Sequence, residues 1–250
     1  MSFAADSPLA DGVIASPNRG ARVGGALDLL ILHYTGMPTA QAALERLCDP
    51  AAEVSAHYFV FEDGRIVQMV PESDRAWHAG ASAWAGARDI NSRSIGIEIA
   101  HPGHAGGLPP YPEPQMAAVT ALTRDIVTRR AIPGPRVLAH SDVAPARKED
   151  PGELFPWERL ARAGVGHWVP PAPMRDGRFF ALGDTGQPVE ALQAMLALYG
   201  YDQPVTGRFD AAMAAVVTAF QRHFRPARID GVADSSTITT LRDLIAAQPA

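Results

Sequence analysis

The sequence predicts an α/β protein, with a central mixed β-sheet flanked by helices and a second, small C-terminal domain of three helices. Short apolar runs typical of strands alternate with helical patterns in the first part of the chain, and three helical stripes follow a proline-rich stretch. The 250 residues are enough for a main domain and a small companion. We therefore expect a main domain at residues 1–168, a proline-rich linker at 169–177 and a helical domain at 178–250.

The first predicted strand is the apolar run at residues 26–33, which is bounded by glycines and is too short for a typical helix. We expect this strand to be buried and to end at His33. Thr39 is a suitable N-cap for the short helix that follows, because its hydroxyl can accept a hydrogen bond from a free backbone N–H. Partial helical spacing continues over Ala42, Leu44 and Leu47.

Two further segments have strand patterns. Residues 56–70 contain two apolar runs separated by a turn with the pair Asp63-Gly64, which strongly favours a β-hairpin. Residues 94–100 alternate in polarity, so one face of this strand carries three isoleucines and the other carries Glu98. Glu98 is therefore predicted to point away from the apolar face.

A helix, a strand and a long loop are predicted to complete the main domain. Apolar residues recur at helical spacing over 114–130, and the turn Pro133-Gly134-Pro135 precedes a strand at 136–139. The polar stretch 140–156 is predicted as a loop, and residues 157–163 as a closing helix. Loops of this length in compact domains are often functional.

The tail is predicted to be a small helical module. Three prolines in the four positions 170–173 mark a semi-rigid linker before it. Two segments, 205–210 and 229–234, have a similar pattern. Each is a turn that ends in an aspartate placed to cap the following helix. The three apolar stripes consist of Val189, Leu192, Leu196 and Tyr199; Met213, Val216, Val217, Phe220 and Phe224; and Ile238, Leu241 and Ile245.

Composition excludes several classes of protein. Hydrophobic residues make up 47% and charged residues 20%, as in ordinary globular proteins. The formal net charge of −5 does not provide the excess positive charge that nucleic-acid binding usually requires. The single cysteine, Cys48, cannot form an internal disulfide. We find no stretch of about 18 apolar residues and no signal peptide, so we expect no membrane span. The sequence as written favours the cytoplasm, or the periplasm and cell envelope if a signal was removed.

Three polar residues stand at strand ends or in the adjoining loop, where rigid scaffolds present ligands. They are His33, His140 and Asp150. Two imidazoles and one carboxylate are a recognised zinc set that leaves a fourth position for water. Spacing alone does not single them out, because other candidate ligands are available: Asp142, Glu149 and His57.

Five blocks of sequence, in order, are similar to the N-acetylmuramoyl-L-alanine amidases of the phage lysozyme and peptidoglycan recognition protein superfamily. The resemblance runs from about residue 27 to about residue 160. The blocks are Leu32-His33-Tyr34-Thr35-Gly36, Ser55-Ala56-His57-Tyr58, Ala76-Trp77-His78-Ala79-Gly80, residues 91–98 (NSRSIGIE), and His140-Ser141-Asp142 continuing to residues 147–152 (RKEDPG).

The resemblance implies a site. It assigns one Zn²⁺ per chain to His33, His140 and Asp150, and catalytic roles to Glu98 and Lys148. Glu98 would act as general base and acid, and Lys148 would stabilise the oxyanion. Substrate contacts are expected from His78, Asn91, Arg93 and His57. For His78 a structural hydrogen bond is an equal alternative, and His57 is also interpreted as a packing residue behind the ligands. The remaining histidines, at positions 101, 104, 167 and 223, are expected in surface or loop positions.

The tail resembles the three-helix peptidoglycan-binding module of many cell-wall hydrolases. The resemblance covers about residues 178–245, including Leu182-Gly183-Asp184-Thr185-Gly186 and Ala219-Phe220-Gln221. Both resemblances imply peptidoglycan or muropeptides as the partner, and we expect a monomer. The implied reaction is hydrolysis of the amide between the lactyl group of N-acetylmuramic acid, or its anhydro form, and L-alanine. Two alternatives stay open: a recognition protein that binds without cutting, and a zinc endopeptidase on the same scaffold.

Overall fold

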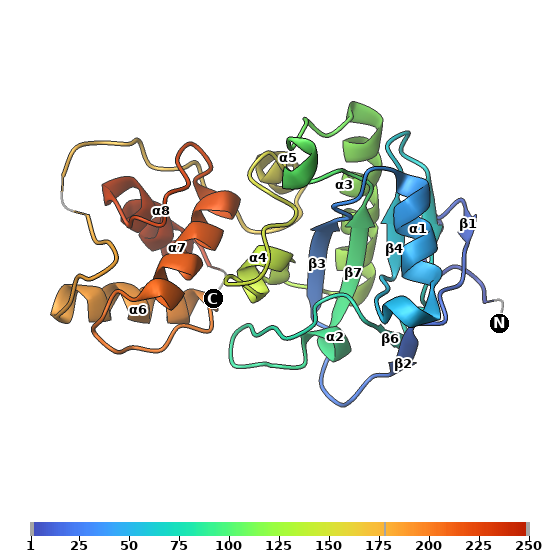
Figure 1. The fold of residues 1–250 in the computed structure, drawn as a ribbon, viewed down its shortest axis with the longest axis horizontal. Helices are drawn as coiled ribbons and strands as arrows, with labels where there is room; N and C mark the ends of the chain where they lie inside the picture. The colour runs from blue at the N-terminus through green and yellow to red at the C-terminus, as the bar shows by residue number, and fades with distance from the viewer. Residues whose placement is uncertain (1–2, 178, 249–250) are drawn as a thin grey trace.

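A computed structural model describes residues 3–177 and 179–248. Its centre is a six-stranded mixed sheet in the order β1-β5-β4-β7-β3-β8 (Figure 1). The sequence predicts a central mixed sheet but not this strand order. Strands β3, β7 and β8 run parallel, β4 is parallel to β7 and antiparallel to β5, and β1 is parallel to β5. The strands are β1 (Gly12–Val13), β3 (Leu29–Tyr34), β4 (Tyr58–Val60), β5 (Ile66–Gln68), β7 (Ser94–Ile99) and β8 (Val137–Ala139).

One face of the sheet is covered by α3 (Glu113–Arg130). Leu30 and Leu32 of β3 and the three isoleucines of β7 pack with the apolar stripe of this helix in one buried cluster. The short helix α5 (Trp157–Arg162) adds Trp157 and Leu160 to the same cluster. Burial of these side chains supplies the main driving force for folding this layer.

The opposite face of the sheet is shared by two groups of residues. Near β4 and β5 it is covered by α1 (Ala40–Cys48), whose N-cap Thr39 accepts a hydrogen bond from the Ala42 N–H as predicted. Near β3 and β8, Leu29, Ile31 and Leu138 belong to a buried cluster that extends to the C-terminal helices. Between these two groups, two polar side chains near the carboxyl ends of β3 and β7 point to this face. They are His33 and Glu98, which are paired in register.

Short elements complete this part of the chain. A two-stranded sheet joins β2 (Arg19–Ala21) and β6 (Asp74–Ala76), and α2 (Ile90–Arg93) precedes β7. None of these has a sequence prediction, since runs of three or four residues carry no measurable periodicity. Three 3₁₀ turns connect longer elements, at Pro50–Ala52, His104–Gly106 and Gly134–Arg136.

The predicted loop at 140–156 begins differently from expectation. Residues His140–Val143 form one helical turn, α4, directly after β8. The Asp142 carboxylate accepts a hydrogen bond from the Ala139 N–H at 2.8 Å, which stabilises the turn. His140 therefore starts a helix instead of a loop.

The C-terminal part consists of α6 (Gln187–Tyr199), α7 (Ala211–Phe224) and α8 (Ser235–Ala246), which lie beside the sheet in Figure 1. The predicted apolar stripes meet in a common core. Asp210 and Asp234 cap α7 and α8 by accepting hydrogen bonds from Met213 N and Thr237 N. The capping interpretation of both aspartates is thus correct.

The two similar turn segments of the tail also share a tertiary contact. Gln193 Oε1 accepts hydrogen bonds from Thr206 N and Gly207 N. Gln221 Oε1 accepts them from Asp230 N and Gly231 N. Each turn is therefore tied to a buried glutamine of the preceding helix, so the resemblance of the two segments reflects a repeated structural unit. Among the described residues, no helix combines the length and apolar character that crossing a bilayer requires.

Candidate active site

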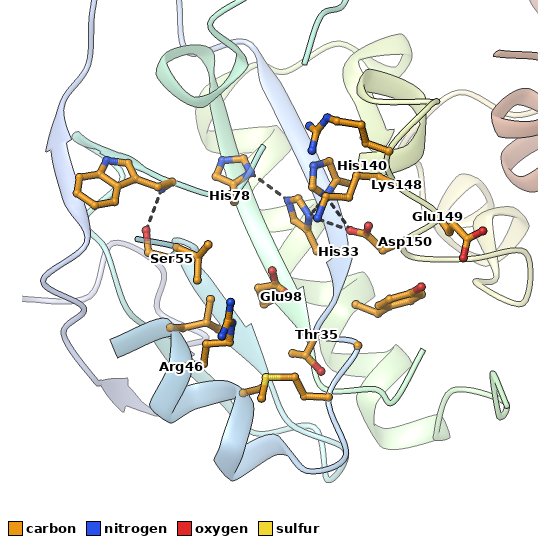
Figure 2. A pocket seen from close by; sticks show the side chains of 18 of the residues that line it. His33, Thr35, Arg46, Ser55, His78, Glu98, His140, Lys148, Glu149 and Asp150 are labelled. Atoms are coloured by element: carbon orange, nitrogen blue, oxygen red, sulfur yellow. Dashed lines mark hydrogen bonds and ion pairs between the residues drawn. The ribbon is translucent and has the colours of Figure 1, made fainter. Parts of the chain in front are cut away.

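Three side chains from separate segments converge at the carboxyl end of β3. His33 comes from β3, His140 from the start of α4, and Asp150 from the following loop (Figure 2). The two Nδ1 atoms are 2.9 Å apart, and each lies 3.0 Å from Asp150 Oδ2. All three residues are buried. Their donor atoms form a nearly equilateral triangle with sides of about 3 Å.

The proton on His140 can be assigned from its partner. His140 Nε2 lies 3.1 Å from the Ala79 carbonyl oxygen, which can only accept a hydrogen bond. Nε2 therefore carries the proton, and Nδ1 of the neutral ring presents a lone pair to the triangle. Ligating histidines commonly donate their other N–H to a carbonyl in this way.

The triangle fits a metal ion. Donors at about 2.0–2.1 Å from a tetrahedral zinc lie roughly 3.3 Å from one another, close to the observed separations. Burial alone would raise the pKa of Asp150, but the adjacent His140 and His33 hold it below its ordinary value. Burial and the neighbouring His140 lower the pKa of His33 to about 4. Asp150 and His33 thus favour their deprotonated forms, which are the forms that bind metals. This buried group can hold a metal ion.

Glu98 lies on β7, beside His33 on β3. Its Oε2 atom is buried and has no hydrogen-bond partner among the residues that the structure describes. Burial, together with the negative charge of Asp150, raises the pKa of Glu98 well above 4.5, while Lys148 opposes the rise. A carboxyl group with a raised pKa beside a metal site is suited to accept and return a proton.

These groups lie in a cavity of about 590 Å³. Lys148 stands beside His140 and Asp150 on one wall, and Arg46 of α1 lies on the opposite side (Figure 2). Further lining comes from Tyr34, Trp77 and Arg222. A cavity of this size with few convergent polar groups is typical of a small-molecule site.

Three predicted substrate-binding residues are held outside the cavity lining. Asn91 Oδ1 accepts hydrogen bonds from His78 N and Ala79 N, so this side chain anchors the backbone next to the cavity. Arg93 forms an ion pair with Asp28. The ring of His57 is buried, accepts a hydrogen bond from Gly96 N and contacts the Asp74 carbonyl. These contacts occupy polar atoms of Asn91, Arg93 and His57, and the assignment of these three residues to substrate binding stays a prediction. The packing interpretation of His57 agrees with its position.

Two of the histidines expected in surface or loop positions are buried, His101 in a loop and His223 in a helix. His101 stacks on Tyr111 and Tyr34, and its Nε2 contacts the Pro109 carbonyl at 2.7 Å. His223 of α7 stacks on Trp157. His104 and His167 are half-buried and contact Tyr34 and Tyr199, respectively. The partners of these residues could not be predicted, because they lie in other elements.

The C-terminal helices contact the segments that carry the site. Asp142, two residues after His140, accepts hydrogen bonds from His223 Nδ1 at 2.6 Å and from the Tyr201 hydroxyl at 2.7 Å. Arg222 donates to Glu149 at 2.9 Å, next to Asp150. Asp142 is fully buried, so these contacts hold α4 firmly against the helical part. Sequence periodicity cannot reveal such contacts between distant elements.

We expect His223→Ala to lower the free energy of unfolding by about 2–3 kcal/mol, because it removes a hydrogen bond to a buried carboxylate. Urea unfolding of the whole chain would measure the change. The matched control is His167→Ala, which removes a hydrogen bond to the neutral Tyr199 hydroxyl and should cost about 1 kcal/mol. Equal losses in the two variants would show that Asp142 does not depend on His223.

Comparison with known proteins identifies the family. A family model described as N-acetylmuramoyl-L-alanine amidase matches residues 23–153, which contain His33, His140 and Asp150. The chain belongs to the N-acetylmuramoyl-L-alanine amidase family. A second model, for a peptidoglycan binding domain, matches residues 185–241 of this amidase.

The amidase has similar relatives of known name. It is 40% identical to N-acetylmuramoyl-L-alanine amidase AmiD of Escherichia coli over 227 residues, which cover 84% of this chain and 79% of AmiD. It is 33% identical to 1,6-anhydro-N-acetylmuramyl-L-alanine amidase AmpD of Enterobacter cloacae over 149 residues, which are 53% of this chain and 78% of AmpD.

Solved structures agree over nearly the whole amidase. AmiD of Escherichia coli, in complex with anhydro-N-acetylmuramic acid-L-Ala-D-γ-Glu-L-Lys, superposes with a TM-score of 0.74 at 38% identity, covering 91% of this chain and 92% of AmiD. AmpDh3 of Pseudomonas aeruginosa gives a TM-score of 0.74 at 30% identity and covers 100% of both chains. The α/β fold with its helical C-terminal part is therefore shared with these proteins.

Proposed function

We propose that this amidase hydrolyses the amide between the lactyl group of N-acetylmuramic acid, or of its anhydro form, and the L-alanine of a stem peptide. The observation that supports this most strongly is the triangle of His33, His140 and Asp150 beside the orphaned Glu98 oxygen. The named substrate of the AmiD complex has the same amide.

We further propose that His33, His140 and Asp150 hold one zinc ion per chain. Their donor set of two imidazoles and one carboxylate is typical of catalytic zinc, with a position left for water or substrate. When bound, zinc supplies Lewis acidity, which makes water a stronger nucleophile at neutral pH and polarises a carbonyl group.

Glu98 and Lys148 would move the proton and stabilise the charge. Glu98 accepts a proton from the attacking water, whose oxygen bonds to the lactyl carbonyl carbon. The Lys148 ammonium stabilises the negative charge that develops on the carbonyl oxygen. The C–N bond then breaks, and Glu98 returns the proton to the departing nitrogen. The products are a lactyl carboxylate and a peptide with a free L-alanine amine.

We also propose that the division at residues 1–168, 169–177 and 178–250 is functional, with the last segment binding the glycan or peptide of the wall. The peptidoglycan binding domain model at 185–241 supports this assignment. The contacts of Arg222 and His223 with the loops of the site suggest that substrate held by the helical part would reach the cavity directly.

Product analysis tests the proposed reaction. We expect the zinc-loaded protein to release a peptide with a free amino-terminal L-alanine from an anhydromuramyl tripeptide and from sacculi, as measured by mass spectrometry. Chelation should abolish release, and added zinc should restore it. Cleavage within the stem peptide would indicate an endopeptidase, and binding without cleavage would indicate a recognition protein. Either outcome would contradict the proposal.

A further inference from the structure

The second ring nitrogen of His33 faces another histidine. His33 Nε2 lies 3.0 Å from His78 Nδ1, and the two rings meet edge to face at an interplanar angle of 81° (Figure 2). One proton is shared by such a contact, because one nitrogen must donate and the other accept. Its position decides whether His33 Nδ1, at the triangle, has a lone pair or a proton.

Ser94 settles the direction of this hydrogen bond. Its Oγ atom lies 2.7 Å from the Ile90 carbonyl oxygen and 3.1 Å from His78 Nε2. The carbonyl can only accept, so it takes the single hydroxyl proton of Ser94, and Ser94 Oγ accepts from His78 Nε2–H. His78 Nδ1 then has a lone pair and accepts from His33 Nε2–H. His33 Nδ1 is left with its lone pair directed at His140 and Asp150.

Burial favours a single direction for the hydrogen bonds from His33 through His78 to Ser94. Ser94 is fully buried, and 8% of the surface of His78 is exposed. The hydrogen-bond partners of the His78 ring are His33 and Ser94, and neither of them is a carboxylate. A buried positive charge without an opposite charge is costly, so a neutral ring with one proton is favoured. A neutral ring is what a hydrogen-bond chain with one direction requires.

Gly96 provides the space for His78. It lies in the interior of β7, where glycine weakens a strand and usually marks a close approach of another group. A Cβ atom at this position would lie 2.5–2.7 Å from three ring atoms of His78. Any side chain at position 96 would therefore displace the ring from His33.

We propose that Ser94 and His78 form a hydrogen-bond relay that fixes the tautomer of His33, and that residue 96 is glycine in order to admit this relay. His78, which also lines the cavity, is then a positioning residue, as in the structural one of the two interpretations that the sequence leaves open. The benefit for function rests on the proposed metal site, since the relay presents a lone pair where a metal ligand is needed. Partners of this kind typically contribute 10–100-fold to metal affinity or activity.

The relay can be tested in zinc-free protein, apart from the metal site itself. Long-range ¹H–¹⁵N correlation spectra of the ¹⁵N-labelled whole chain report which ring nitrogen of each histidine is protonated. We expect the Nε2–H tautomer for both His33 and His78. A His33 ring protonated at Nδ1 in the wild-type protein would overturn the proposal, and this measurement needs no variant.

Variants add a second measurement. In Ser94→Ala, His78 Nε2–H loses its acceptor, so we expect a mixture of His33 tautomers and a 10–100-fold weaker zinc affinity in competition with a chelator. Gly96→Ala should have the same effect by displacing the ring. The matched control is Ser16→Ala, which removes another buried serine that donates to a carbonyl, Leu47 O, at 2.6 Å. It should leave both readouts unchanged.

The outcomes separate the relay from the metal site. If Ser94→Ala had the same His33 tautomer and the same zinc affinity as the wild-type protein, the relay would be refuted. The expected tautomers in a wild-type protein that binds no zinc would leave the relay intact and refute the proposed metal site. A loss of zinc affinity in Ser16→Ala equal to that in Ser94→Ala would show a general effect of buried serines and would also refute the relay.

Discussion

Glu98→Gln should lower kcat by at least about 10²-fold while zinc remains bound, because glutamine keeps the shape of the side chain but cannot accept the proton. Steady-state kinetics on an anhydromuramyl peptide would measure the rate, and elemental analysis would measure the zinc. Glu62→Gln is the matched control, since Glu62 is an exposed residue of the hairpin turn. Full activity in Glu98→Gln would show that another group moves the proton.

The pH dependence of the rate gives a second check on Glu98. Burial and the Asp150 charge raise the pKa of Glu98 well above 4.5, with Lys148 acting in the opposite direction. A general base must be ionised, so kcat of the wild-type protein should fall as the pH drops through this raised pKa. The residual rate of Glu98→Gln should lack this fall. If kcat fell at low pH in the same way in both proteins, the fall would be due to a group other than Glu98.

Asp150→Ala should lose zinc and activity together. Removing a residue that only orients a ligand costs 10–100-fold in metal affinity, so removing a direct ligand should cost more than about 100-fold. Chelator competition would measure the affinity. The neighbouring Glu149→Gln is the matched control, because Glu149 also lines the cavity and competes with Asp150 as a candidate ligand in the sequence. If Glu149→Gln lost zinc and Asp150→Ala retained it, the assigned ligand would be wrong.

The sequence predicts the layered fold well because its longer elements have clear periodicity. The alternation around Glu98 puts three isoleucines against α3 and Glu98 on the opposite face. The pairing of His33 with Glu98 was not predictable, because register between distant parallel strands depends on the whole sheet. The one-turn helix α4 was missed because four residues show no helical period.

Roles that depend on contacts between distant residues could not be predicted. Asn91 and His78 lie in blocks that resemble the family, yet one anchors a backbone segment and the other contacts His33. The burial of His223 requires α7 to pack on α4, about 80 residues away in the sequence. A glycine within a strand, such as Gly96, is a signal that could have drawn attention to the ring packed against it.

Anomalous diffraction at the zinc absorption edge, from crystals of the zinc-loaded protein, tests the central claim most directly. We predict one anomalous peak per chain, at about 2.0–2.2 Å from His33 Nδ1, His140 Nδ1 and Asp150 Oδ2. A peak bound elsewhere, or a triangle of these three atoms that excludes the metal in zinc-loaded crystals, would contradict this assignment.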